Sequence, residues 1–295
     1  MTTTTTNHLE RKRTGAADPT TSVRRVSILD LGHLEIDSSV MSFGLHQARV
    51  DDKNLPAKWI GVPLQAILVE TNDARILFDT GTHPDSKSRW PDVLAPYEYL
   101  VASPEQFLPN RLAQVGLKPT DIDFAVLSHL HMDHSGGIEF LTNAKVLVHR
   151  NEFRSALDHY ARLDGSPAYV KDDIAGWISN AIQWSPVEPD EDNRILAPGV
   201  TVINWGAAHT EGDLGLKIEL PESGTLVLCG DACYSSVNLG PPPVLPGSTA
   251  LWDSQGLLRV ARRLERLRSE GAEIWFPHDP DQYATLMKAP EGSYS

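Results

Sequence analysis

The chain has 295 residues, 41% of them hydrophobic, and a formal net charge of −13 at pH 7. This composition supplies a sizeable core but not the basic surface that phosphate backbones require, so we expect no nucleic-acid partner. Nowhere does the sequence run through about 18 consecutive apolar residues, which argues against a membrane-spanning segment.

Residues 1–22 are rich in threonine and charged side chains, and we expect a disordered tail there, followed by one folded domain over residues 23–295. The tail lacks the apolar core and the cleavage site of a secretory signal. Cys229 and Cys233 are the two cysteines, too few for a disulfide framework. We therefore expect a cytoplasmic protein.

Short apolar runs alternate with helical patterns along the chain. Helices are expected within 100–117, 151–163 and 253–271, the last with Asp253 as N-cap and Gly271 as its stop. The mixture predicts an α/β fold in which helices cover sheets. Strands are expected over residues 25–31, 64–70, 74–80, 123–128, 145–149, 200–205, 214–220, 225–230 and 273–277.

The stretch "SHLHMDHSGG" (128–137) concentrates side chains that bind metals. His129 and His131, two residues apart in a turning loop, can address one ion, while Asp133 and His134 on the next turn can address a second. The glycines that follow, Gly136 and Gly137, are expected to let the backbone turn tightly and start a helix.

More candidate ligands follow the ends of predicted strands. His129 follows 123–128, His209 follows 200–205, Asp231 follows 225–230 and His278 follows 273–277. Side chains delivered from the same end of several strands meet in a cleft at the sheet edge. Two neighbouring ions need a bridging carboxylate, and Asp231 is the carboxylate left to supply it.

These residues carry a family resemblance. "HLHMDH" with His209, Asp231 and His278, together with "ILFDTG" (76–81), resembles the metallo-β-lactamase superfamily. Within it, "DACY" (231–234), "FPHD" (276–279) and "LEIDSSVMSFG" (34–44) resemble the N-acyl-homoserine lactonases. The resemblance implies a four-layered αβ/βα sandwich, with the metals in the cleft between its two sheets. "AHTEGD" (208–213) departs from the family: it keeps the ligand His209 but has Glu211 and Asp213 in place of the usual proline and structural histidine.

The implied function is opening of a lactone ring, most of all that of N-acyl-homoserine lactones, by two divalent metal ions. Zinc is the expected metal, with iron, manganese and cobalt as alternatives. Tyr234 would donate a hydrogen bond to the carbonyl oxygen, and Asp133 would carry a proton from the attacking water to the leaving oxygen. Asp79 is expected to support the ligand loops. The expected metal ligands are His129, His131, Asp133, His134, His209, Asp231 and His278.

Other readings stay open on the sequence. Another lactone or ester, such as a γ-butyrolactone or an aromatic lactone, fits the same ligands, and a non-catalytic metal-binding regulatory protein is the alternative of a different class. The expected partner is a small-molecule lactone, with a homodimer left open and no membrane. Aromatic residues are candidates for an acyl-chain pocket, with packing of loops onto the core as the alternative: Phe43, Trp59, Trp90, Tyr97, Tyr169 and Trp177. The segment 83–104 is a candidate cover for the cleft.

Overall fold

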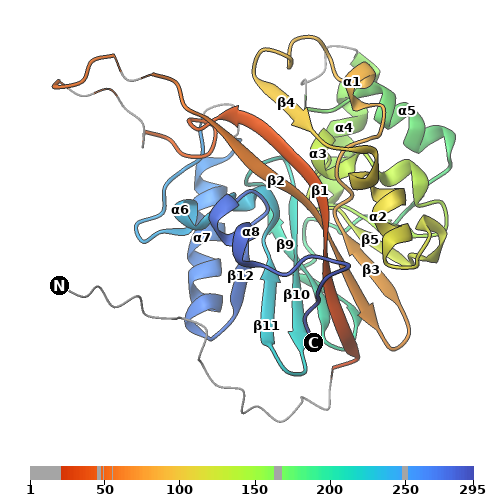
Figure 1. Ribbon diagram of the computed structural model, residues 1–295. Coiled ribbons are helices and arrows are strands. Elements are labelled where there is room, and N and C mark those ends of the chain that lie inside the picture. Colours follow the sequence, from red (N-terminus) through yellow and green to blue (C-terminus); the bar gives the residue numbers. More distant parts are fainter. Residues whose placement is uncertain (1–20, 45–47, 49, 55, 163–167, 248–251) are drawn as a thin grey trace.

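The computed structural model describes residues 21–44, 48, 50–54, 56–162, 168–247 and 252–295, and it contains two sheets that face each other (Figure 1). The larger has the strand order β4-β1-β2-β3-β5-β6-β7 and the smaller β12-β11-β10-β9-β8. The predicted tail lies outside the described residues except for Thr21 and Ser22, which hydrogen bond to the carbonyls of Glu219 and Pro198.

All nine predicted strands are present, and β4, β7 and β8 are additional. The strands are β1 Val23–Asp37, β2 Trp59–Thr71, β3 Arg75–Phe78, β4 Glu98–Val101, β5 Phe124–Val126, β6 Lys145–Leu147, β7 Gln183–Trp184, β8 Asn193–Ala197, β9 Val200–Gly206, β10 Asp213–Leu220, β11 Gly224–Leu228 and β12 Glu273–Trp275. Strands β3, β5, β6 and β7 run parallel, as do β11 and β12, so their carboxyl ends point the same way within each sheet.

The three predicted helices form as α2, α4 and α7. Helix α7 begins after Asp253, whose side chain accepts the backbone N–H of Gln255, and Gly271 follows it with a φ of 103°. None of the described helices has the length and apolar character needed to cross a membrane. The helices are α1 Ser86–Arg89, α2 Leu108–Gln114, α3 Met132–Ser135, α4 Arg150–Arg162, α5 Lys171–Ser179, α6 Ser236–Leu239, α7 Ser254–Ser269 and α8 Pro280–Thr285.

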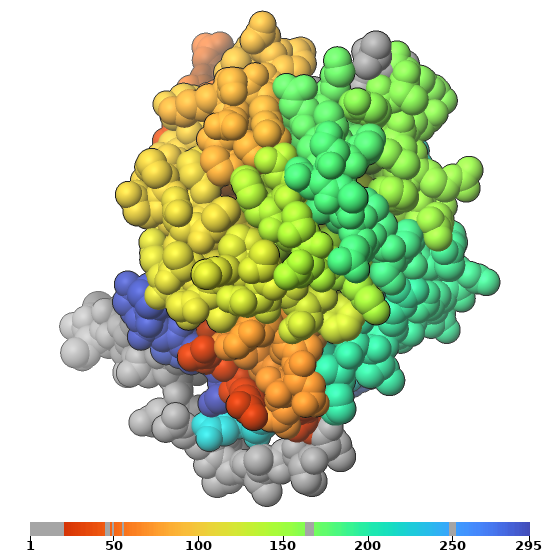
Figure 2. All heavy atoms as spheres, turned by 90° about the vertical axis from the view of Figure 1, so that its right-hand side faces the viewer, coloured from red at the N-terminus to blue at the C-terminus, as the bar shows by residue number. Residues whose placement is uncertain are grey.

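Three apolar clusters separate four layers. One lies between the two sheets and includes Ile28 and Val69 from one sheet and Leu216 from the other. A second lies between the large sheet and helices α2, α4 and α5, whose outer face is the yellow to green part of Figure 2. The third joins the small sheet to α7 through residues such as Leu264. Each buried leucine or isoleucine contributes roughly 1.5–3 kcal/mol. The predicted αβ/βα sandwich is confirmed.

Candidate metal centre

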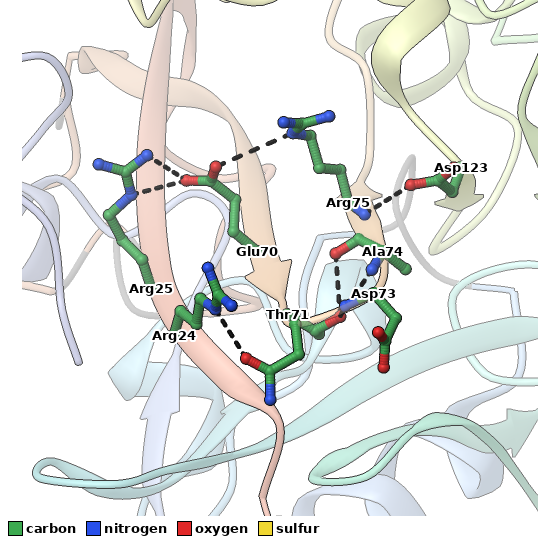
Figure 3. Close-up of a pocket in the computed structure, with 9 residues that line it drawn as sticks. Arg24, Arg25, Glu70, Thr71, Asp73, Ala74, Arg75 and Asp123 are labelled. Atoms are coloured by element: carbon green, nitrogen blue, oxygen red, sulfur yellow. Dashed lines mark hydrogen bonds and ion pairs between the residues drawn. The ribbon is translucent and has the colours of Figure 1, made fainter.

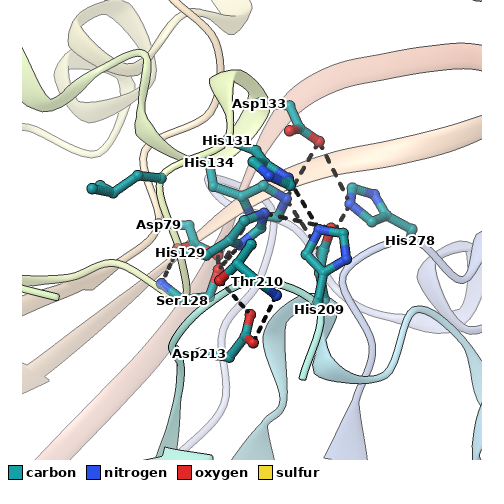
Figure 4. A network of polar contacts seen from close by, with 12 residues as sticks. Asp79, Ser128, His129, His131, Asp133, His134, His209, Thr210, Asp213 and His278 are labelled. Carbon is teal, nitrogen blue, oxygen red and sulfur yellow. Dashed lines mark hydrogen bonds and ion pairs between the residues drawn. The ribbon is translucent and has the colours of Figure 1, made fainter. Parts of the chain in front are cut away.

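The seven predicted ligands come together where strands from both sheets end. His129 follows β5, and His131 caps α3, which carries Asp133 and His134. His209 follows β9 and His278 follows β12 (Figure 4). Asp231 lies in the turn after β11. Three groups of ligand atoms have spacings of at most 4.8 Å: His129, His131 and His209; His129, His134 and Asp231; Asp133, His134 and His278.

Asp231 lies between the two outer groups and presents one oxygen to each. Its Oδ2 lies 3.8 Å from His129 Nε2 and 3.5 Å from His209 Nε2. Its Oδ1 lies 3.3 Å from His134 Nε2 and 3.2 Å from His278 Nε2. A carboxylate turned in this way is suited to bridge two ions.

Unpartnered buried atoms test whether these residues fit metal ions. His129 Nε2, His134 Nε2 and Asp231 Oδ1 are buried and lack a hydrogen-bond partner among the described residues. Buried polar atoms are normally satisfied, so three unpartnered atoms gathered within this cluster call for a ligand. Tetrahedral zinc with bonds of about 2.0–2.1 Å places its ligand atoms roughly 3.3 Å apart, close to the 3.0 Å between His209 Nε2 and His131 Nδ1. The residues therefore fit a pair of metal ions.

Asp79 and Ser128 fix two of the rings from behind. Asp79 Oδ1 accepts the Ser128 backbone N–H at 2.7 Å, and its Oδ2 accepts from Ser128 Oγ and from His134 Nδ1, both at 2.9 Å. Ser128 Oγ lies 3.0 Å from His129 Nδ1. With each Nδ1 occupied in this way, the Nε2 lone pairs of His129 and His134 are left for a metal.

The turn that holds Asp79 has a strained backbone. Asp79 has a φ of 59°, a conformation that non-glycine residues rarely adopt and that is concentrated at functional sites. Gly136 packs directly on this turn, because a Cβ there would lie 2.2 Å from the backbone nitrogen of His83. Helix α3 already begins at Met132. The glycines therefore follow α3, and the helical element that starts after them is a short 3₁₀ turn with Gly137 as its N-cap. Gly136 is needed for close backbone contact, in line with the expected tight turn.

The pKa shifts differ between the half of the site around His131 and the half around Asp133 and His134. Burial, and then the His209 ring, lowers the pKa of His131 to about 3, which leaves it neutral, the form that binds metal. Burial alone would raise the pKa of Asp133, but His134 outweighs it and holds the pKa at about 2. Burial lowers the pKa of His134, yet Asp133 and Asp231 raise it well above its usual value. The half of the site around Asp133 and His134 therefore favours positive charge, which a divalent cation supplies.

A buried acidic layer beneath the ligand loops was not predicted from the sequence. Glu152 on α4 accepts the backbone N–H of Leu130 at 2.9 Å and the Tyr169 hydroxyl at 3.0 Å. Asp213, which replaces the usual histidine, accepts the backbone N–H of Thr210 at 3.0 Å. Burial and the charge of Asp213 raise the pKa of Glu152 to about 8. The layer joins the loop of His129 and His131 to that of His209.

A cavity of about 100 Å³ opens beside the ligands. Tyr234 lines it and is 8% exposed, with ring centroids 5.3 Å from His209 and 5.4 Å from His278. Burial, then Asp231, raises the pKa of Tyr234 well above its usual value, so its hydroxyl remains a hydrogen-bond donor. Glu98 from β4 also lines the cavity and was not predicted. The apolar wall consists of Leu34, Ile36, Val40, Met41, Val62, Met132 and Ala168.

None of the aromatic candidates is among the residues that line this cavity, whose apolar wall is aliphatic, so the alternative of packing onto the core or surface holds for them. Trp177 is buried in the core beneath the helices, and Tyr169 supports Glu152. Phe43, Trp59 and Tyr97 are exposed. The predicted cover 83–104 does supply one lining residue, Glu98, which a four-residue strand is too short to reveal by alternation.

A larger hollow, of about 520 Å³, lies at the opposite end of the large sheet (Figure 3). Arg25 there pairs with Glu70, Arg24 Nε donates to Asn72 Oδ1, and the Arg75 backbone N–H donates to Asp123. The contacts of this open surface are thus one local ion pair and hydrogen bonds that tie neighbouring strand ends together. We therefore assign the chemistry to the ligand cluster.

Comparison with known proteins identifies the class. Residues 60–273 match the family model described as the metallo-beta-lactamase superfamily, and the chain belongs to that superfamily. Within it, the chain is 35% identical to the N-acyl homoserine lactonase AiiB of Agrobacterium fabrum, over 92% of this chain and 99% of that protein. It is 28% identical to an N-acyl homoserine lactonase of Bacillus thuringiensis, again over 92% and 99%.

A solved structure agrees with these matches. It is an N-acyl homoserine lactone hydrolase with the product N-hexanoyl-L-homoserine bound at its catalytic metal centre. It superposes with a TM-score of 0.75 at 26% identity, covering 92% of this chain and 99% of that one. The predicted resemblance to N-acyl-homoserine lactonases is thus confirmed.

Proposed function

We propose that this protein is a metal-dependent hydrolase that opens the lactone ring of N-acyl homoserine lactones. The observation that carries the proposal is the orientation of Asp231, which turns each carboxylate oxygen toward a different pair of histidine rings. The relatives named as N-acyl homoserine lactonases match over nearly their whole length, which supports the same substrate class here.

His129, His131 and His209 would hold one ion, Asp133, His134 and His278 the other, and Asp231 both. When bound, two divalent ions polarise a carbonyl oxygen and lower the pKa of a water molecule so that it attacks at neutral pH. Imidazole and carboxylate ligands suit zinc, and also iron, manganese and cobalt. Zinc as the native metal remains a prediction, as does a homodimer.

Two side chains act on the substrate itself. The Tyr234 hydroxyl lines the cavity and stays protonated, so it can donate to the carbonyl oxygen as negative charge develops there. The Asp133 carboxylate also lines the cavity and is ionised at neutral pH. It can accept the proton of the attacking water and return it to the leaving ring oxygen, which completes ring opening to a hydroxy acid.

The aliphatic wall fits the remaining part of such a substrate. Leu34, Ile36, Val62 and Met41 are buried around the cavity and present no hydrogen-bonding side chain to a ligand. An acyl chain that leaves water on this surface gains roughly 0.8 kcal/mol per buried methylene. We therefore expect activity to rise with acyl-chain length until the cavity is filled.

The test is hydrolysis of a lactone panel by protein of measured metal content, followed by proton release and by the mass gain of one water. Acyl-homoserine lactones of short and long chain, γ-butyrolactone, an aromatic lactone and a β-lactam make up the panel. Chelator-sensitive opening of acyl-homoserine lactones is expected. Faster turnover of another ester would assign that ester as the substrate in place of acyl-homoserine lactones. Two bound metals without any turnover would favour a non-catalytic regulatory role.

A further inference from the structure

Glu98 occupies an unusual position at the edge of the large sheet. It opens β4, the edge strand, where it pairs with Ile36 of β1. Side chains alternate along a strand, so Glu98 shares the inward face with the buried Leu100, while Tyr99 between them is exposed. A carboxylate therefore occupies the inward face of β4, where the other inward side chain, Leu100, is apolar and buried.

The Glu98 carboxylate lines the cavity, and one of its oxygens has no hydrogen-bond partner among the described residues. Glu98 lines the cavity beside Asp133, Tyr234 and His278, and its Oε2 is buried without a hydrogen-bond partner among the described residues. Leaving a buried acceptor unpaired is unfavourable by roughly 1–3 kcal/mol. Apart from Tyr234 and the proposed metal ligands, it is the polar side chain among the residues lining this cavity. Glu98 Oε2 is thus placed to accept a hydrogen bond from a ligand in this cavity.

An acyl-homoserine lactone with a plain acyl chain carries one hydrogen-bond donor. Its ester and carbonyl oxygens only accept, whereas the amide N–H, on the ring carbon next to the reacting carbonyl, donates. The amide therefore enters the cavity close to the metal ligands that neighbour Glu98. We propose that Glu98 is a specificity-determining residue whose carboxylate accepts the amide N–H of the substrate. This inference rests on the proposed function and names the group by which the site would select amide-bearing lactones.

The hydrogen bond between Glu98 and the amide N–H would let the site discriminate between lactones with and without an amide. A site built to bond a polar group rejects an analogue that lacks the group, because its own buried atom is then left unpaired. The matching analogue is α-hexyl-γ-butyrolactone, which has the same ring and an alkyl chain but no amide. Wild-type protein should prefer N-hexanoyl homoserine lactone over it.

The experiment measures the ratio of kcat/KM for N-hexanoyl homoserine lactone to that for α-hexyl-γ-butyrolactone. Glu98→Leu should lower this ratio roughly tenfold or more, and Glu98→Gln, which keeps an acceptor oxygen, should retain most of it. Glu35→Leu makes the same change at an exposed position on the neighbouring strand β1 and should leave the ratio alone. Calorimetry with the product N-hexanoyl-L-homoserine should show a matching loss of affinity in Glu98→Leu.

Two outcomes would overturn the assignment. An equal fall for both lactones in Glu98→Leu and Glu98→Gln would make Glu98 a proton donor in the reaction. An unchanged ratio with increased aggregation of Glu98→Leu would make it an inward-facing charge that protects the sheet edge. If the wild type opens neither lactone, the proposed function fails, and product binding by wild type and Glu98→Leu still decides whether Glu98 binds the amide.

Discussion

Removing the buried carboxyl of Glu152 should destabilise the protein and its metal centre together. Glu152 is fully buried and accepts the Leu130 N–H and the Tyr169 hydroxyl. Glu152→Ala removes the acceptor of two buried donors, at roughly 1–3 kcal/mol each, so the loss is up to roughly 2–6 kcal/mol. For a chain of this size that corresponds to a decrease in Tm of roughly 3–10 °C.

Glu152→Gln is the matched control. The pKa of Glu152 is raised to about 8, so at pH 7 the side chain is mostly a neutral acid, which glutamine resembles in shape. We expect a Tm close to wild type at pH 7. Between the ordinary pKa of 4.5 and about 8, the folded protein keeps a proton that the unfolded chain releases, so wild-type stability falls as pH rises. Glutamine has no such proton, and the Tm of Glu152→Gln relative to wild type should increase from pH 6 to pH 9.

The assay is thermal unfolding of metal-loaded protein at several pH values, with metal content measured on the same samples. Leu130 lies between His129 and His131, so Glu152→Ala should also bind its metals more weakly. A Glu152→Ala protein with wild-type Tm and metal content would refute the reasoning. A constant Tm difference between Glu152→Gln and wild type across this pH range would refute the raised pKa.

Three further predictions concern the centre itself. Asp231→Ala should bind less than half of the wild-type metal and turn over no lactone; full metal content by elemental analysis would rule out its bridging role. Tyr234→Phe should keep its metal while kcat falls roughly tenfold to a hundredfold, as for one lost oxyanion donor, and an unchanged kcat/KM would exclude the hydrogen bond we assign to it. Gly136→Ala should lower Tm, because its Cβ would lie 2.2 Å from the His83 nitrogen, and a wild-type melting curve would show that this turn can shift.

Much of the site was predictable because its ligands are marked by local sequence. "HLHMDH" places four proposed ligands within six residues, and the others, His209, Asp231 and His278, each follow an apolar strand that periodicity identifies. Strand ends converge by the geometry of the sheet, so the cluster follows once the strands are found.

Glu98 and Glu152 could not be found by the same means. Their roles arise from packing between segments distant in sequence, and β4 is too short to show alternation. Glu152 left one weak signal: it shares a helical face with the buried Ser155 and Ala156, where a carboxylate is out of place. The acyl-chain wall was not identified from the sequence, because its aliphatic side chains, mostly from β1, β2 and the segment after β1, carry no local pattern that separates a cavity wall from the core.

The proposed ligands come in two sets from the two halves of the chain. His129, His131, Asp133 and His134 follow strand β5 of the large sheet, and His209, Asp231 and His278 follow strands of the small one. Neither half can therefore complete the proposed metal centre alone. In a refolding experiment, lactonase activity should return only after both sheets have docked, so it reports assembly of the whole fold. Two separately expressed halves would be inactive until mixed, which makes the protein a natural starting point for a split-enzyme sensor.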